Sequence, residues 1–371
     1  MATIVDVANL AGVSRGTASN VFTHPHRVRQ ALRDKVMAAA SALNYAGPNP
    51  KVRFLKGGRL NAIGVTPPGA YGVQAAFDNS YLREFLSGVS KVCDERGASL
   101  TLVSGVGDDN TWGIRNAVVD GFIIHRFEEA ATIEAQRRRL PCVFVDMDGN
   151  AQTSSVRIDD RAGARAAAEH LVDLGHRKFA IFSVLRETEA RTEPIFHDPD
   201  EKGRKLSSTF ALDKDRLDGY LSALAVVGVR SEDVPIVETR ADVISAAAAG
   251  ASMLFDRAPE VTAVLAMTDV QALAVLHEAE RRGIRVPQDL SVVGFDDILE
   301  SASAHPPLTT VSHPIGEKGE VAARLLFGEA ETQHIVLPVR LIVRSSTAAP
   351  RQAGQRSSTA DGKSRPSRRR S

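Results

Sequence analysis

Cysteine is scarce in this sequence, and long apolar runs are absent. The 371 residues contain only Cys93 and Cys142, too few for a disulfide framework or a four-cysteine zinc site. Each cysteine lies next to a valine, and we expect both to be buried structural thiols. No stretch has the apolar length of a membrane span, and no basic residue precedes the apolar N-terminal residues. We therefore expect no membrane association and no export, which predicts a cytoplasmic protein.

Motifs of the common enzyme classes are also missing. None of the ten histidines lies in an H-E-x-x-H pattern, and there is neither a G-x-S-x-G elbow nor a Walker phosphate loop. We expect His125 and His176 to be buried and structural. The sequence thus predicts no enzyme, no cofactor and no metal site.

What the chain does have is an uneven distribution of charge. Its net charge is +1, but residues 1–60 carry +7, residues 349–371 carry +6 and residues 61–348 carry −12. A basic head on an acidic body suits a chain whose head binds a polyanion. A solvated basic surface without a partner has the same charge, so charge alone does not decide.

The first 45 residues predict three short helices. Thr3 and Asp6 have the spacing of a capping box, Gly12 ends the first helix, and Ser14 caps the second. Apolar residues at three- and four-residue steps predict a third, amphipathic helix within 30–45. The second helix keeps Ala18 and Val21 for packing and turns a polar set to solvent: Arg15, Gly16, Thr17, Ser19 and Asn20.

Apolar runs alternate with amphipathic stretches from residue 61 onward, and the alternation restarts near residue 177. This rhythm predicts strands alternating with helices in two parallel-sheet lobes. Residues 186–212 read as an exposed loop. We divide the chain into a head (1–46), a linker rich in Gly, Pro and basic residues (47–60), a two-lobed domain (61–348) and a disordered basic tail (349–371).

The segment TIVDVANLAGVSRGTASNVF at residues 3–22 resembles the helix-turn-helix of the lactose-repressor (LacI/GalR) family. It is followed by a third helix that ends L-N-Y. AEHLVDLGHRKFAIFS at 168–183, R-L-D-G-Y at 216–220, VPQDLSVVGFDD at 286–297 and PLTTVSHPIGEKGEVAARLL at 307–326 resemble the effector domain of the same family. The resemblance implies an all-α helix-turn-helix head and an α/β effector domain of two parallel-sheet lobes, similar to periplasmic sugar-binding proteins.

The resemblance also implies which residues meet DNA. The second helix would enter the major groove, where the guanidinium of Arg15 can donate two hydrogen bonds to a guanine. Asn20 would pair with an adenine or a phosphate, and Gly16 either allows close backbone approach or is neutral. Tyr45 either contacts a phosphate or packs in the small core. The full predicted set is Thr3, Ser14, Arg15, Gly16, Thr17, Ser19, Asn20, Asn44, Tyr45, Arg53, Leu55 and Lys56.

In the family the linker forms a short helix that enters the minor groove. Leu55 would then be the residue wedged between bases, with Arg53 and Lys56 beside it. Upstream of this element Ala46 and Gly47 intervene where the family has one residue, so the register of the linker departs from the family pattern.

Ligands of two-lobed α/β proteins bind where the strands end. Carboxylates and a guanidinium at such ends would hold hydroxyls or an anion. The alternative for each residue is a helix cap or an ion pair between lobes, and for Asp297 a cap is the expectation. Thr268 stands where sugar-binding members commonly have asparagine, which weakens the case for a sugar. The predicted effector residues are Asp146, Arg216, Thr268, Asp269 and Asp296.

The sequence therefore predicts a ligand-responsive transcriptional regulator, a repressor, that binds a near-palindromic double-stranded operator as a homodimer, with a tetramer left open. A small effector, a sugar or a similar metabolite, would bind between the lobes. A solute-binding transport protein fits the body but not the basic head. A sugar-processing enzyme is supported only by analogy of fold.

Overall fold

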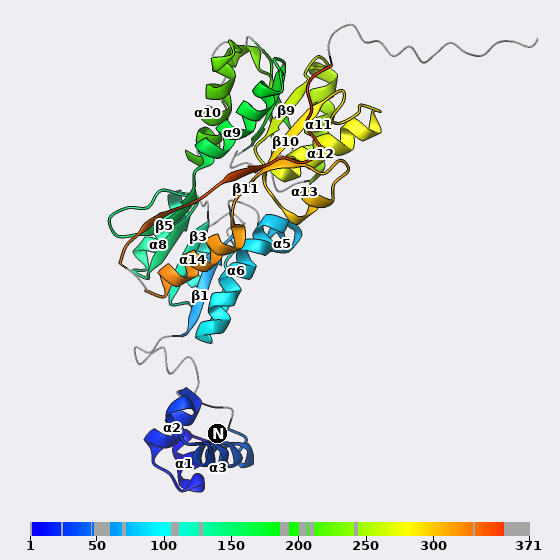
Figure 1. Ribbon diagram of the computed structural model, residues 1–371. Coiled ribbons are helices and arrows are strands. Elements are labelled where there is room, and N and C mark those ends of the chain that lie inside the picture. Colours follow the sequence, from blue (N-terminus) through cyan, green and yellow to red (C-terminus); the bar gives the residue numbers. More distant parts are fainter. Residues whose placement is uncertain are drawn as a thin grey trace, which may run out of the picture. The chain divides into compact units, whose positions relative to one another are not determined.

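The computed structural model describes residues 2–23, 25–45, 47, 60–68, 72–104, 111–125, 129–185, 193–199, 206–207, 211–240, 244–328 and 331–351. These residues form two compact units (Figure 1). One unit is Met1–Ile63 with Val118–Asp120 and includes the predicted head, and the other is Gly64–Ala117 with Gly121–Ser371. We call the two-lobed part of the chain the body. Within the described ranges, none of the helices has the length and apolar character needed to span a bilayer.

The head begins with the predicted helices. They are α1 (Ile4–Ala11), α2 (Arg15–Thr23), a 3-10 turn (Pro25–Arg27) and α3 (Gln30–Ala42). The capping box is formed, because the Thr3 hydroxyl accepts from the Asp6 amide and the Asp6 carboxylate accepts from the Thr3 amide at 2.8 Å. Gly12 ends α1 with a φ of 66°, a conformation that a side chain disfavours.

Small apolar residues from all three helices fill the core of the head. Val7, Ala18 and Val36 are fully buried, with Val21 and Ala39 beside them. Because small residues allow the helices to approach closely, a compact core forms within fewer than fifty residues. Ala18 and Val21 thus pack as predicted.

The body has two lobes, each built on one sheet (Figure 1). The six strands of the first lobe lie in the order β12-β5-β4-β3-β1-β2. The elements of the first lobe are β1 (Ala62–Thr66), α5 (Gly72–Asp78), α6 (Ser80–Arg96), β2 (Ser99–Leu102), α7 (Trp112–Asn116), β3 (Gly121–His125), α8 (Glu129–Arg137), β4 (Cys142–Val145), β5 (Ser154–Ile158), α14 (Ile315–Leu326) and β12 (His334–Leu337).

The seven strands of the second lobe lie in the order β13-β11-β10-β9-β6-β8-β7. The inner strands are parallel, whereas β13 and β7 at the two edges are antiparallel to their neighbours. The elements are α9 (Asp160–Asp173), β6 (Phe179–Val184), β7 (Ile195–His197), α10 (Ala211–Val226), a 3-10 turn (Ser231–Asp233), β8 (Ile236–Thr239), α11 (Ile244–Arg257), β9 (Ala263–Ala266), α12 (Asp269–Arg281), β10 (Ser291–Asp296), α13 (Leu299–Ser303), β11 (Thr309–Ser312) and β13 (Arg340–Ile342).

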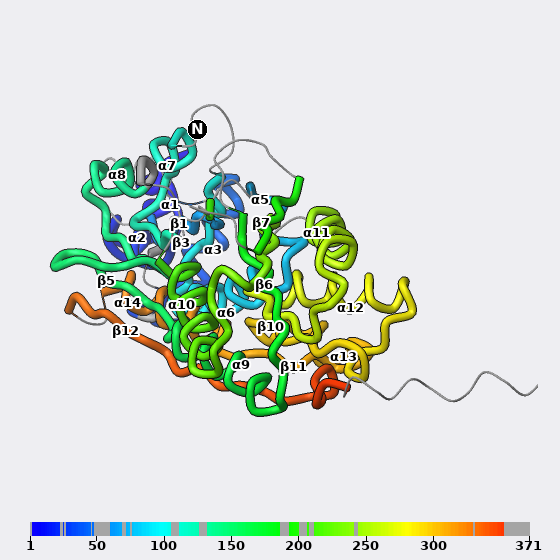
Figure 2. The backbone as a smooth tube through the Cα atoms, turned by 90° about the horizontal axis from the view of Figure 1, so that it is seen from above, coloured from blue at the N-terminus to red at the C-terminus, as the bar shows by residue number. Residues whose placement is uncertain are grey.

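Helices cover both faces of the second sheet. Figure 2 shows α9 and α10 on one side of β6 and β10, with α11 and α12 on the other. A parallel sheet covered on both faces is buried throughout, which explains the nearly continuous apolar runs of β6, β9 and β10.

The chain passes between the lobes three times. The crossings run from β5 to α9, from β11 to α14 and from β12 to β13. They lie side by side, because Leu337 is paired with Ile158 in one sheet and Ser312 with Arg340 in the other. Residues 334–342 thus form two short strands that belong to different sheets.

Two expectations need correction. The segment expected as an exposed loop contains the edge strand β7, in which His197 is buried against Glu238 with 2.8 Å between Nε2 and Oε2. Cys142 is half-buried, whereas Cys93 is buried as expected.

The linker and the tail lie almost entirely outside the described residues, so the domain boundaries within 47–60 and from 349 onward remain predictions.

Candidate DNA-reading surface and effector site

The start of α2 presents its polar residues to solvent. Arg15, Gly16 and Asn20 are exposed, and Thr17 and Ser19 are half-buried. The Ser14 hydroxyl accepts from the Thr17 amide at 3.0 Å and lies 2.9 Å from the Thr17 hydroxyl. These bonds satisfy the helix start and fix the first turn of α2, which carries Arg15.

The predicted contact set also includes Thr3, which caps α1, and two residues after α3, Asn44 and Tyr45. Tyr45 packs edge-to-face on Phe22 with 5.7 Å between ring centroids, which favours the core alternative. Asn44 is exposed and has a φ of 49°. A side chain at Gly16 would meet nothing closer than the Ser14 hydroxyl at 3.8 Å, so packing within the head does not require glycine there. Arg53, Leu55 and Lys56 lie outside the described residues.

Charged and aromatic side chains of both lobes meet at the crossings, and we call this set the interlobe cluster. Its members are Tyr81, His125, Asp146 and Lys318 from the first lobe, Asp160, Arg216 and Asp296 from the second, and His313 from the crossing after β11.

Asp146 is the centre of the first-lobe half. It follows β4, and its carboxylate accepts from Lys318 Nζ at 2.8 Å and from the Tyr81 hydroxyl at 3.0 Å. His125 Nε2 lies 3.1 Å from the same carboxylate. Asp146, Lys318 and His125 are buried, so the ion pair between Asp146 and Lys318 is desolvated, and the Tyr81 hydroxyl is a further donor to its carboxylate.

Arg216 is the centre of the second-lobe half. Its guanidinium donates to Asp160 at 2.7 Å and to the Met267 carbonyl, lies 3.6 Å from Asp296 and stacks over the Phe295 ring at 3.6 Å. Burial works against the charge, but Asp160 and Asp296 outweigh it and raise the pKa of Arg216.

His313 joins the two halves. Its Nε2 lies 3.4 Å from Asp296 Oδ1 of the second lobe, and its ring centroid lies 6.0 Å from that of Tyr81 of the first. Burial raises the pKa of Asp160 to about 6, an effect that Arg216 and Lys318 oppose and Asp146 reinforces. Charges of both lobes therefore act on one another.

The backbone at this cluster is unusual. Asp146 has a φ of 54° and Asp296 a φ of 121°, values that non-glycine residues seldom adopt. Such conformations gather at functional sites, where the surrounding contacts hold them. The backbone at the ends of β4 and β10 thus has positive φ values that the sheets themselves do not require.

Two predicted effector residues have structural surroundings instead. Thr268 caps α12 by accepting from the Gln271 amide at 3.3 Å. Asp269 is fully buried and accepts from the Ile298 amide and from the hydroxyls of Ser301 and Thr310. These contacts favour the structural alternative for both residues.

The expectation for Asp297 is wrong. Its carboxylate does not cap a helix but forms an ion pair with Arg344 at 2.7 Å.

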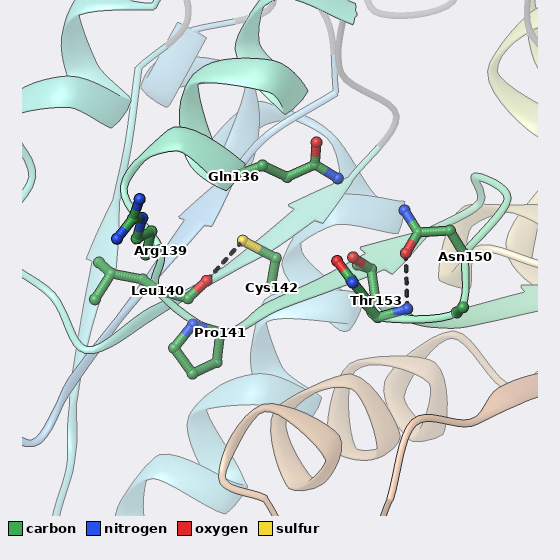
Figure 3. Close-up of a pocket in the computed structure, with 9 residues that line it drawn as sticks. Gln136, Arg139, Leu140, Pro141, Cys142, Asn150 and Thr153 are labelled. Atoms are coloured by element: carbon green, nitrogen blue, oxygen red, sulfur yellow. Dashed lines mark hydrogen bonds between the residues drawn. The ribbon is translucent and has the colours of Figure 1, made fainter.

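A separate cavity of about 730 Å³ lies in the first lobe, between the end of α8 and the turn after β4 (Figure 3). Cys142 lines it, and its thiol donates to the Leu140 carbonyl at 3.4 Å. Burial raises the pKa of Cys142 to about 11, so the thiol stays protonated at neutral pH and is a poor nucleophile.

Comparison with known proteins decides the family. The lacI family model of bacterial regulatory proteins matches residues 3–49, and the periplasmic binding protein-like domain matches residues 168–347. The transcriptional regulator Rv3575c of Mycobacterium tuberculosis is 32% identical over 359 residues, which cover 94% of this chain and 97% of the relative. The chain belongs to the LacI family.

Solved structures of LacI-family proteins agree. A lac repressor dimer bound to operator and the anti-inducer ONPF superposes with a TM-score of 0.72 at 26% identity, covering 94% of this chain and 99% of that one. A complex of the regulator CelR with cellobiose gives a TM-score of 0.64 at 27% identity, covering 93% and 100%. The predicted fold class is confirmed, and this LacI-family chain is a DNA-binding transcriptional regulator.

Sequence reasoning predicted as site residues three of the eight members of the interlobe cluster of this LacI-family protein. Asp146, Arg216 and Asp296 were predicted, and the structure brings them to one place. Lys318 and Asp160 were not predicted, because a lysine or aspartate inside a helix normally faces solvent or caps a terminus. The only available signal was position, since Asp160 begins α9 directly after a crossing and Lys318 follows the next crossing by a few residues.

Proposed function

We propose that this LacI-family regulator is a repressor that binds a near-palindromic operator as a homodimer and releases it when a small neutral sugar binds between the lobes. Reading of DNA would fall to α2, with Arg15 as the main base contact. A protein with this role acts on chromosomal DNA, so the proposal places it in the cytoplasm and gives it no catalytic activity.

The interlobe cluster is the observation that carries the proposed effector site. It joins side chains of both lobes, so a molecule bound there would favour one arrangement of the lobes over others. A coupling free energy of ~1–3 kcal/mol between effector and operator is the usual size for such a device.

The charges of the cluster favour a neutral ligand. Its ion pairs contain three carboxylates but only two cations, Arg216 and Lys318, so a bound anion would meet excess negative charge. The carboxylates are those of Asp146, Asp160 and Asp296. Hydroxyl groups can both donate to carboxylates and accept from cations, which suits a sugar. The relative CelR, solved with cellobiose, supports the same class.

The proposal is tested by selecting operators from a random duplex library with the intact protein and then titrating sugars into the complex. We expect a palindromic consensus, two chains per operator, and a fall in operator affinity on adding one neutral sugar. A consensus without dyad symmetry would contradict the homodimer, and a sugar that tightens the complex would contradict release.

A further inference from the structure

Lys318 is a lysine in an unusual place, because lysine is almost never fully buried unless it is paired. Its side chain is only 1% exposed and is among the largest fully buried side chains. It lies on α14, which packs closely against α6 and so faces Tyr81 at the start of that helix. Burial of a charge at this cost needs partners for all of its donors.

The hydrogen bonds of the Lys318 ammonium use two of its three N–H groups. An ammonium group has three N–H donors. One donates to Asp146 Oδ1 at 2.8 Å and another to the Tyr81 hydroxyl at 3.2 Å. Among the described residues the ammonium forms no third hydrogen bond, and its other neighbour is the Tyr81 ring, with 5.5 Å between Nζ and the ring centroid.

Two aromatic neighbours connect Lys318 to the opposite lobe. The ammonium donates to Tyr81, whose ring centroid lies 6.0 Å from that of His313, and His313 Nε2 lies 3.4 Å from Asp296 of the second lobe. The ammonium is therefore at the meeting of the lobes rather than deep inside one of them. An oxygen atom of a bound molecule at that meeting would complete its hydrogen bonding.

We infer that Lys318 contacts the effector and determines its class, by donating its third N–H to a hydroxyl or ring oxygen of a neutral, polyhydroxylated ligand. This rests on the proposed function and adds to it a residue and a bond. Asp146 already neutralises the ammonium, so Lys318 acts as a directed donor and does not attract anions. An acidic or phosphorylated sugar would in addition face Asp160 and Asp296.

The first experiment establishes a ligand for the intact protein. Isothermal titration is carried out with common neutral mono- and disaccharides, including glucose, ribose and cellobiose, and with glucuronate and glucose 6-phosphate. We expect a neutral sugar to bind and its acidic counterpart to bind about ten-fold more weakly or not at all. If no sugar binds, both the proposed effector class and the role of Lys318 are wrong. If the acidic counterpart binds more tightly, the neutral class is overturned.

The second experiment tests Lys318 itself with the sugar so found. Lys318→Met keeps the length of the side chain without its donors, and we expect it to weaken binding about ten-fold or more. The matched control is Lys91→Met, since Lys91 is an exposed lysine of the same lobe paired with Glu320 at 2.8 Å. It should bind within about two-fold of the unsubstituted chain. Equal affinity of the Lys318→Met variant would overturn the contact while leaving the proposed function intact.

A third measurement separates contact from support of the fold. The affinities of singly deoxygenated analogues are compared with that of the parent sugar. One analogue should bind the unsubstituted chain about ten-fold more weakly than the sugar does, whereas for the Lys318→Met variant the same comparison should give less than about two-fold. Should that variant fold poorly, Asp146→Asn combined with Lys318→Met removes the buried pair as a whole and should show the same pattern. Equal losses for every analogue in both proteins would overturn the inference.

Discussion

Arg15 shows how one exposed side chain can set sequence preference. It lies in the first turn of α2, which the Ser14 and Thr17 hydroxyls hold in place. We expect Arg15→Ala to relax base preference at one operator position per half-site, at a cost of ~1–3 kcal/mol for the preferred base.

Binding of that variant to a library of single-base operator variants measures the effect. Lys35→Ala is the control, since Lys35 is exposed on α3 and any effect should be the same for all sequences. A uniform loss for Arg15→Ala as well would make Arg15 a phosphate contact.

The buried carboxyl of Asp269 should make the free energy of unfolding depend on pH. Burial, reinforced by Asp296, raises the pKa of its carboxyl to about 7, from about 3.9 in an unfolded chain. The folded state thus holds the proton more tightly, and the free energy of unfolding should fall as the pH rises from about 4 to about 7. Asp269→Asn should reduce this fall by ~1 kcal/mol or more.

Urea denaturation across that pH range checks the slope. Asp233→Asn is the control, because a hydrogen bond from Arg230 lowers the pKa of Asp233 and moves its titration below the window. Parallel profiles for the Asp269→Asn variant and the unsubstituted chain would mean that the carboxyl is ionised throughout.

At the scale of the element, helices α14 and α6 pack closely because glycines lie where they touch. A Cβ on Gly319 would lie 2.2 Å from the Phe85 carbonyl oxygen, and one on Gly88 would lie 1.9 Å from that of Gly316. Only glycine permits this approach, which also sets Lys318 beside Tyr81. We expect Gly319→Ala to lower the free energy of unfolding by ~1–3 kcal/mol.

The same helix supplies the control for that measurement by urea denaturation. A Cβ on Gly316 would meet nothing closer than 3.9 Å, so Gly316→Ala should be neutral or stabilising by up to ~1 kcal/mol. Equal effects of the two substitutions would contradict the close packing.

Elements with a strong periodic pattern could be predicted from the sequence, and those made by tertiary contacts could not. The head helices follow from capping residues and apolar spacing, both of which are local. Strand β7 could not be predicted, because its three residues, Ile195–His197, are too few to show a period and it forms by pairing with β8. In the same way Asp146 was found at a strand end, but its partner Lys318 is distant in sequence.

The segregation of charge governs the molecule as a whole. Since residues 1–60 carry +7 and residues 61–348 carry −12, operator binding should depend strongly on salt and effector binding should not. We expect operator affinity to fall about 1,000-fold or more between 50 and 200 mM KCl, and sugar affinity to change less than about two-fold.

Fluorescence anisotropy of a labelled operator, alongside titration of the sugar, measures the two slopes. A scrambled duplex should lose affinity as steeply as the operator, since phosphate contacts are common to both. An operator affinity that is flat with salt would remove the head from DNA binding.

The three adjacent crossings between the lobes restrict how this regulator can respond. Each link is only a few residues long, and two of them continue paired strands, so the halves of the body can neither drift apart nor slide freely. The remaining freedom is a pivot about a line through Ile158, Ser312 and Leu337. A ligand can therefore change the angle between the two lobes but not the distance between them. Its effect on operator binding would come from rotation of one lobe against the other.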